Sequence, residues 1–242
     1  MEFTLLGASA IGVGSFWLML RWEARRGNAA GCALDLWDAG LTAGAVGLLA
    51  GRLIAMAQAG ISPFTDPAQI ILVRSGVSTS GASIAALLTF GFLARRSLLE
   101  SADAIAPSAL AGLAGWHAGT LLTGSWLGTV SDLPWAQTAS GSDITRHPVE
   151  LYAAGLYLLA AMGIALWKQR GRPHLGAPAG LALAAAGGVR LITETMRISL
   201  SGGPLWLYVG AIVAGLALAV WTTVQHRRSK TDEARQTTDD GA

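Results

Sequence analysis

Apolar residues fill long continuous stretches of the chain, and short polar segments separate these stretches. Each stretch comes close to the roughly 20 residues that a helix needs to cross the hydrocarbon core of a bilayer. The stretches are rich in Ala, Leu and Gly and lack the alternation of a membrane β-strand. The pattern predicts an all-α bundle of seven transmembrane helices, at residues 3–21, 34–58, 77–94, 103–123, 149–167, 176–196 and 204–224.

The composition excludes an ordinary soluble domain, because 52% of the residues are hydrophobic and only 13% are charged. The single cysteine, Cys32, rules out an intramolecular disulfide and a thiolate metal cage, so we expect no metal and no cofactor. The first stretch has no basic segment before it and no small-residue cleavage site after it, so we expect it to remain as the first helix. The basic balance of a membrane chain gives no reason to expect a nucleic-acid partner.

Basic residues alternate between the two sets of loops. Of the 17 Lys and Arg residues, twelve follow the first, third, fifth and seventh stretches, namely Arg21, Arg25, Arg26, Arg95, Arg96, Lys168, Arg170, Arg172, Arg227, Arg228, Lys230 and Arg235. The opposite loops contain only Arg74, Arg146 and Arg197. The positive-inside rule then predicts an N-terminus outside the cell and a C-terminus in the cytoplasm.

The remaining segments complete the expected organisation. Residues 1–226 form the transmembrane domain, and the two longest loops, 59–75 and 124–147, lie on the outer side and could build a small cap. Residues 227–242 are polar, free of aromatic residues and charged with both signs, so we expect a disordered cytoplasmic tail. In the second stretch Gly40, Gly44, Gly47 and Gly51 form a small-residue stripe on which a neighbouring helix can pack closely.

Several ionisable residues lie at the depth of the outer leaflet. Arg52 falls in the outer half of the second stretch, Arg190 and Glu194 in the outer half of the sixth, and Arg146, His147 and Glu150 at the outer entrance of the fifth. A charge at the bilayer centre costs on the order of 3 kcal/mol, so such groups usually face the bundle interior or a wet cavity. Two arginines that face one cavity suit a phosphate, because each guanidinium donates two parallel hydrogen bonds, and the abundant phosphate at this depth is a phospholipid head group.

Simpler interpretations remain open. Arg74 and Arg197 could snorkel to the membrane surface, and Arg190 with Glu194 could be a structural i, i+4 pair. A transporter is disfavoured, because no stretch has a proline in its middle and the inner half of the bundle contains no charged residue that would line a pathway.

Five segments resemble a known family. They are GLLAGRL (47–53), LVRSGVSTSGAS (72–83), LPWAQ (133–137), RHPVELYAAGL (146–156) and GGVRLITETMR (187–197), and they are similar in order and spacing to bacterial prolipoprotein diacylglyceryl transferase. The resemblance implies a multi-pass enzyme of the bacterial cytoplasmic (inner) membrane with a cavity open to the outer leaflet. It also implies transfer of the diacylglyceryl group of phosphatidylglycerol to the lipobox cysteine thiol of a preprolipoprotein, with release of glycerol phosphate.

The resemblance assigns roles to individual residues. Arg190 matches a family arginine that holds the lipid phosphate, and Glu194 matches its acidic neighbour. Arg52 matches the arginine of the family's Gly-Ala-Arg-Leu segment, His147 matches its His-Pro motif, and Glu150 stands where glutamine is usual. Arg146 would join them at the mouth of the cavity.

The chain departs from the family at two signatures. The family's His-Gly-Gly motif, whose histidine is often assigned as the base, is replaced by Ser80, Gly81 and Ala82. In GWHAGTLLT (115–123), if Gly119 is the aligned glycine, His117 replaces a phosphate-binding arginine. Thr120 and Thr123 then replace asparagines, and Ser125 replaces a glutamate.

A base must therefore be found elsewhere. Serine cannot deprotonate a thiol near neutral pH, whereas an imidazole with a pKa near 6.5 can. His117 and His147 are the candidates on the outer side, although His147 could be part of a helix cap and His117 an ordinary interior histidine. Arg190, His147 and His117 are thus the expected catalytic residues. The alternative is a paralogue that lost this chemistry and acts as a phospholipid-binding or accessory membrane protein.

Overall fold

The computed structural model describes residues 2–27, 34–65, 67, 70, 76–121, 128–138, 142–171, 173–198 and 203–239. The helices in these ranges are α1 (Glu2–Arg25), α2 (Leu36–Gln58), α4 (Thr79–Leu93), α5 (Leu98–Thr120), α6 (Val149–Gly171), α7 (Ala177–Glu194) and α8 (Leu205–Asp239). One antiparallel pair of short strands, β1 (Gln137–Thr138) and β2 (Thr145–Arg146), lies between α5 and α6. The all-α prediction is confirmed.

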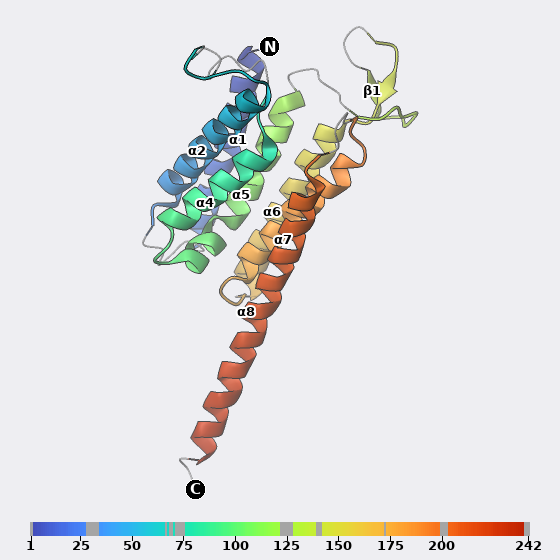
Figure 1. Ribbon diagram of the computed structural model, residues 1–242. Coiled ribbons are helices and arrows are strands. Elements are labelled where there is room, and N and C mark those ends of the chain that lie inside the picture. The colour runs from blue at the N-terminus through green and yellow to red at the C-terminus, as the bar shows by residue number, and fades with distance from the viewer. Residues whose placement is uncertain are drawn as a thin grey trace.

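The helices form two groups that meet at α5 (Figure 1). In the first group α2 packs on α4, and α1 packs on α5; in the second group α7 packs on α6 and α8. Helix α5 joins the groups, because it also packs against α6 and α7. The N-terminus and the C-terminus lie at opposite ends of the bundle, and the strand pair lies at the N-terminal end (Figure 1).

Two glycines of the predicted stripe, Gly47 and Gly51, lie against α4, whereas Gly40 lies against Phe16 and Ile105 and nothing lies within 4 Å of Gly44. A Cβ atom on Gly47 would lie 2.7 Å from the carbonyl oxygen of Ala82, and one on Gly51 would lie 2.8 Å from the carbonyl oxygen of Ser78. The Ser78 amide in turn donates to the Gly51 carbonyl at 2.9 Å. Glycine at these positions therefore lets the two backbones touch, which is the packing that membrane helices commonly use.

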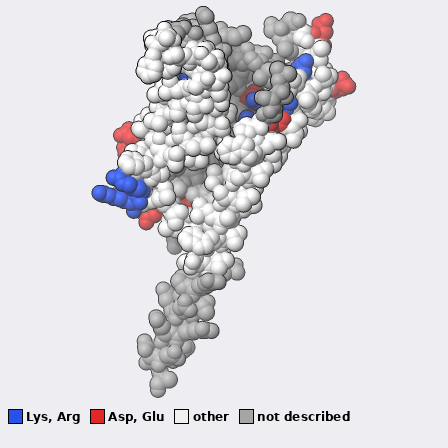
Figure 2. Space-filling model, viewed as in Figure 1, with Lys and Arg blue, Asp and Glu red and all other residues white. Residues whose placement is uncertain are grey.

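The surface of the bundle is that of a membrane protein. Among the described helices, three segments are long and apolar enough to cross a bilayer: Leu36–Gln58, Val149–Gly171 and Leu205–His226. Figure 2 shows that the face over α2 and α4 is nearly free of charged residues, which gather at the lower end of these helices, in the recess beside them and near the strand pair. Large apolar side chains such as Leu88 and Leu159 are more than two-thirds exposed on the helices, as a lipid-facing surface requires.

The C-terminal segment differs from the predicted disordered tail. Helix α8 continues without a break to Asp239. Residues 227–239 contain neither proline nor glycine and are rich in Lys, Arg, Glu, Gln and Ala, which favour helix, so the preceding apolar helix can extend into them.

A buried charged cluster, which the sequence interpretation missed, lies at the end opposite the strand pair. Lys168 Nζ donates to Glu23 Oε2 at 2.6 Å and to the Asp103 carbonyl oxygen at 2.9 Å. The Asp103 carboxylate accepts the backbone amides of Gly176 at 2.6 Å and Ala179 at 2.8 Å, at the start of α7. The expectation that this half lacks charges is therefore wrong. These groups satisfy one another and tie together α1, α5, α6 and α7, rather than lining an open pathway.

One helix contains an internal proline that does not break it. Pro107 lies inside α5 and is fully buried. The helix continues to Thr120 despite it.

Candidate functional site

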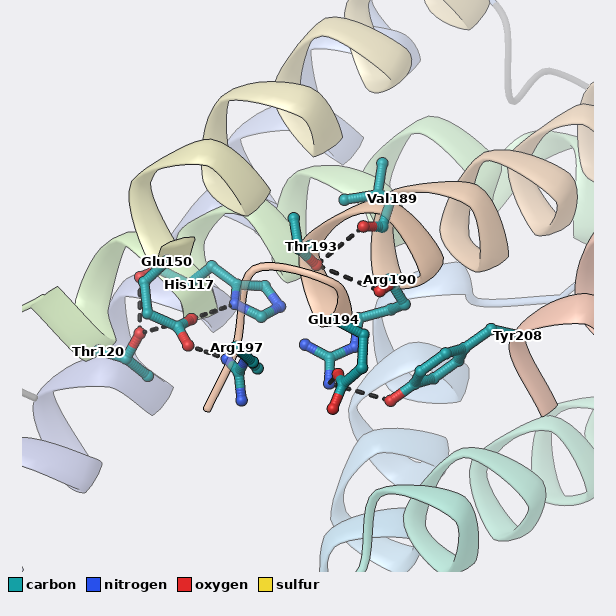
Figure 3. Close-up of polar contacts among 9 residues, drawn as sticks. All are labelled: His117, Thr120, Glu150, Val189, Arg190, Thr193, Glu194, Arg197 and Tyr208. Carbon is teal, nitrogen blue, oxygen red and sulfur yellow. Dashed lines mark hydrogen bonds and ion pairs between the residues drawn. The ribbon is translucent and has the colours of Figure 1, made fainter. Parts of the chain in front are cut away.

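The ends of α5, α6 and α7 converge near the strand pair, and Glu150 lies at their centre (Figure 3). Its carboxylate accepts hydrogen bonds from His117 Nδ1 at 2.5 Å and from Thr120 Oγ1 at 3.2 Å, and it forms an ion pair with Arg197. Glu150 and His117 are only 7% and 6% exposed. An ionised carboxylate buried to this degree needs such partners.

A second group surrounds Arg190 near the C-terminal end of α7. Arg190 Nη2 donates to Glu194 Oε2 at 3.2 Å and to the Tyr208 hydroxyl of α8 at 3.0 Å. The guanidinium carbon lies 5.3 Å from the centre of the Tyr208 ring. Thr193, on the same face, donates to the Val189 carbonyl at 2.8 Å and so faces its own helix. The predicted Arg190–Glu194 i, i+4 pair is confirmed.

Both guanidinium groups retain a buried donor. The Nε atoms of Arg190 and Arg197 have no hydrogen-bond partner among the described residues. A buried donor left unpaired costs roughly 1–3 kcal/mol, and more when it is charged. Figure 2 shows basic and acidic atoms together in the recess between the two groups of helices. The site therefore suits a further acceptor, such as an oxygen of a phosphate.

Arg197 stays charged in this environment. Burial lowers the pKa of its guanidinium, while the Tyr208 hydroxyl acts in the opposite direction. Guanidinium groups remain protonated in proteins. The segment before α6 holds its backbone, because Gly128 pairs with Arg197 as an isolated bridge and the Thr129 amide donates to the Met196 carbonyl at 2.8 Å.

The His117 ring is held in one orientation. It stacks on Tyr157 of α6, with ring centres 5.4 Å apart and planes 19° apart. The Tyr157 hydroxyl donates to the Ala186 carbonyl of α7 at 3.3 Å. Gly119, two residues further along, packs against the backbone of Ala8 in α1. This close contact between α5 and α1 explains why a glycine is needed at position 119. The predicted role of Gly119 in substrate binding stays a prediction.

Arg146 and His147 lie in a separate group at the base of the strand pair. Arg146 Nη1 donates to the Gly128 carbonyl at 3.1 Å. His147 Nδ1 lies 3.4 Å from the Tyr152 hydroxyl, which also accepts a hydrogen bond from Trp135 Nε1 at 2.7 Å. No described contact joins these residues to Glu150 or Arg190.

The predicted residues of the first group of helices lie along α2 and α4. Arg52 is 3% exposed, and its Nη1 donates to the Gly76 carbonyl at 2.7 Å, so it does not face lipid. Ser80 Oγ lies 3.3 Å from Ser78 Oγ, and the Gly81 amide donates to Ser78 Oγ at 3.4 Å, where Ser78 caps α4. Convergence of Arg52 with Arg190 on one ligand stays a prediction.

Sequence reasoning did not predict the contacts of two tyrosines at the site or the buried position of one arginine. Tyr157 and Tyr208 sit within apolar runs that give no sign of a polar role. The interpretation of Arg197 as a snorkelling or surface residue is wrong, because its side chain is 22% exposed and paired with Glu150. Its i, i+7 spacing from Arg190 was the available signal. Cys32, Arg74, Thr123 and Ser125 lie outside the described residues.

No cluster of three metal-ligating side chains occurs in the ranges that the structure describes. The carboxylates of Glu194 and Glu150 pair with Arg190 and Arg197, and the imidazole of His117 contacts the Glu150 carboxylate.

Comparison with known proteins identifies the family. The family model described as prolipoprotein diacylglyceryl transferase matches residues 3–237. Three relatives carry the name phosphatidylglycerol–prolipoprotein diacylglyceryl transferase. The protein from Cupriavidus pinatubonensis is 34% identical over 196 residues, which is 74% of this chain and 69% of the relative. The one from Cupriavidus necator is 36% identical over 57% of this chain and 55% of the relative, and the one from Aliivibrio fischeri is 30% identical over 63% and 60%. The matches to the latter two thus span less than two thirds of those relatives. Because the family model covers nearly all of this chain, the chain belongs to the prolipoprotein diacylglyceryl transferase family.

Proposed function

We propose that the chain transfers the diacylglyceryl group of phosphatidylglycerol to the lipobox cysteine of a preprolipoprotein signal peptide. Family membership and the names of the relatives support this activity. We further propose seven spanning helices in the bacterial cytoplasmic membrane, with the N-terminus outside. The loop arginines support this orientation, and it places the Glu150 and Arg190 groups in the outer leaflet.

The observation that carries the proposal is the pair of buried arginines with unpartnered Nε atoms, Arg190 and Arg197. Transfer of the diacylglyceryl group breaks the bond between a glycerol carbon and a phosphate oxygen, so negative charge grows on the departing phosphate ester. Fixed donors directed at such a charge are strong catalysts, and the loss of one commonly lowers kcat by roughly 10²–10³-fold. Arg190 and Arg197 are the donors that we assign to this role.

We assign supporting roles to the remaining proposed binding residues. Glu194 and Glu150 position the two arginines through their ion pairs. Arg52 and Arg146 add positive charge at the same end of the bundle, and Ser80, Gly81 and Gly119 shape the helix contacts that border it. The thiol, with an ordinary pKa of about 8.5, requires a base, and His117 and His147 are the candidates.

Complementation tests the activity directly. The gene is expressed in a cell depleted of its own transferase, and lipidation of a reporter lipoprotein is scored. We expect lipidation with the wild-type chain and with His174→Ala, a histidine in the loop before α7, and none with Arg190→Ala. Normal membrane insertion of the wild-type chain without lipidation would contradict the proposal and favour a phospholipid-binding accessory protein.

A further inference from the structure

We infer that His117, positioned by Glu150, is the base that takes the proton of the acceptor thiol. This inference rests on the proposed transferase function. In this chain Ser80 stands where the family has the histidine often assigned as the base, and a serine is not basic enough to accept the thiol proton. We therefore assign that role to a residue of α5, held by a residue of α6. The two candidate histidines differ in their neighbours, and this difference decides between them.

The contacts of His117 leave a free lone pair on its second nitrogen. Glu150 is paired with Arg197 and is therefore ionised, and an ionised carboxylate can only accept hydrogen bonds. Nδ1 of His117, 2.5 Å from Glu150 Oε2, must then carry the proton. Nε2 is left as the acceptor, which is the form that a general base requires.

The contacts of His147 fix no such arrangement. The Tyr152 oxygen accepts the hydrogen bond of Trp135 Nε1, an atom that can only donate. It lies 3.4 Å from His147 Nδ1 and can donate to that nitrogen or accept from it, so either tautomer of His147 fits. His147 has no described carboxylate partner, and no described contact joins it to Arg190 or Arg197.

His117 lies next to the groups that we assign to the phosphate. Figure 3 shows its ring between Glu150 and the Arg190–Glu194 pair, with the second nitrogen on the side of that pair. Burial and the nearby charges of Arg190 and Arg197 disfavour a proton on this ring, whereas the Glu150 carboxylate at Nδ1 favours it. Tyr157 is the titratable group stacked on the ring. Glu150 would offset the positive charge that forms when the ring accepts a proton.

The resulting step balances. The thiol proton moves to Nε2 of His117, and a sulfur electron pair forms the S–C bond at the glycerol carbon. The bond from that carbon to the phosphate oxygen breaks, and its electron pair leaves with glycerol phosphate, whose charge falls from −1 to −2 beside Arg190 and Arg197. The proton then passes from His117 to water.

Kinetics of the purified full chain, with phosphatidylglycerol vesicles and a lipobox peptide, test the assignment. We expect His117→Gln to lower kcat at pH 7 by about 100-fold or more, with little change in the KM for lipid. Activity should return in part as the pH passes the thiol pKa of about 8.5, where the nucleophile no longer needs a base. Added imidazole should also restore activity to His117→Gly.

A second variant tests the positioning role of Glu150. Glu150→Gln should lower kcat by about 10-fold or more, with relief above the thiol pKa of about 8.5 as for His117→Gln, and Glu150→Asp should recover part of the loss. His174→Ala is the matched control and should behave as the wild type.

Three outcomes would overturn the assignment. They are a His117→Gln variant with near wild-type kcat at pH 7, a loss that neither alkaline pH nor imidazole relieves, and a Glu150→Gln variant with unchanged kcat. Loss of the same pH-dependent kind in His147→Gln, with His117→Gln active, would move the base to His147. A wild-type chain that transfers nothing would instead contradict the proposed function, so the two failures are distinct.

Discussion

The Lys168–Glu23 pair offers a sharp test of how the bundle is held together. Glu23 is completely buried, the Lys168 side chain is 7% exposed, and the two are 2.6 Å apart. Lys168→Met keeps the length of the side chain but leaves the Glu23 carboxylate without its charged partner. Removal of one partner from a buried ion pair commonly costs about 3–5 kcal/mol, because the remaining charge stays out of water. Lys168→Met also removes the 2.9 Å hydrogen bond to the Asp103 carbonyl.

The double variant separates the cost of an orphaned charge from the value of the pair. Glu23→Met combined with Lys168→Met removes both charges, and an apolar pair of similar volume is often neutral or stabilising. We therefore expect each single variant to lose about 3–5 kcal/mol of unfolding free energy and the double variant to lose far less than their sum. Arg170→Gln, on the exposed side of the same helix, is the control and should stay within about 0.5 kcal/mol of the wild type.

The assay is unfolding of the purified protein in mixed detergent micelles, followed by helix content. Single variants within 1 kcal/mol of the wild type, outside the expected range of about 3–5 kcal/mol, would refute the burial argument. A double variant as unstable as the two single losses combined would show that the two residues act independently.

Three further predictions concern the outer end of the bundle. Tyr208→Phe removes one hydrogen-bond acceptor of Arg190, and hydrogen bonds to charged groups contribute about 1.5–3 kcal/mol. It should therefore lower kcat/KM, measured with vesicles and peptide, by about 10-fold, and an unchanged kcat/KM would exclude Tyr208 from the site. Gly51→Val would force α2 away from α4 and should destabilise the protein by about 1–3 kcal/mol, whereas Gly44→Ala, where nothing lies within 4 Å, should be tolerated. Arg52→Gln should weaken binding of phosphatidylglycerol about 10-fold if Arg52 and Arg190 converge on one phosphate, and equal binding would show that they do not.

The helices followed from the sequence because each is a long apolar run, and their ends were harder to predict. Helix α5 begins at Leu98, five residues before the apolar run at 103, since Glu100 and Asp103 interrupt the hydrophobic pattern without interrupting the helix. Asp103 is tolerated there because it accepts the first amides of α7, a contact 73 residues away in sequence that no local pattern reveals.

The sequence identified several residues of the candidate site, but it did not predict which of them contact one another. Arg190, Glu194 and Glu150 were identified because each is a charged residue in or beside an apolar stretch. Burying a charge in the membrane is costly, so such residues usually have a functional or structural role. The His117–Glu150 contact joins α5 to α6 across 33 residues, and the Arg197–Glu150 pair spans 47, so both depend on tertiary packing. The contact of Tyr208 with Arg190 was also not predictable from the sequence, because a tyrosine in an apolar helix usually serves only in packing.

Lipid binding tests the central claim most directly. The purified chain and its Arg190→Gln and Arg197→Gln variants are titrated with phosphatidylglycerol and, separately, with diacylglycerol, which has the same tails and no phosphate. We expect the wild type to bind phosphatidylglycerol at least about 10-fold more tightly than diacylglycerol, and each variant to lose that preference while it keeps its affinity for diacylglycerol. Equal affinity of wild type and variants for phosphatidylglycerol would contradict a phosphate site at these two arginines.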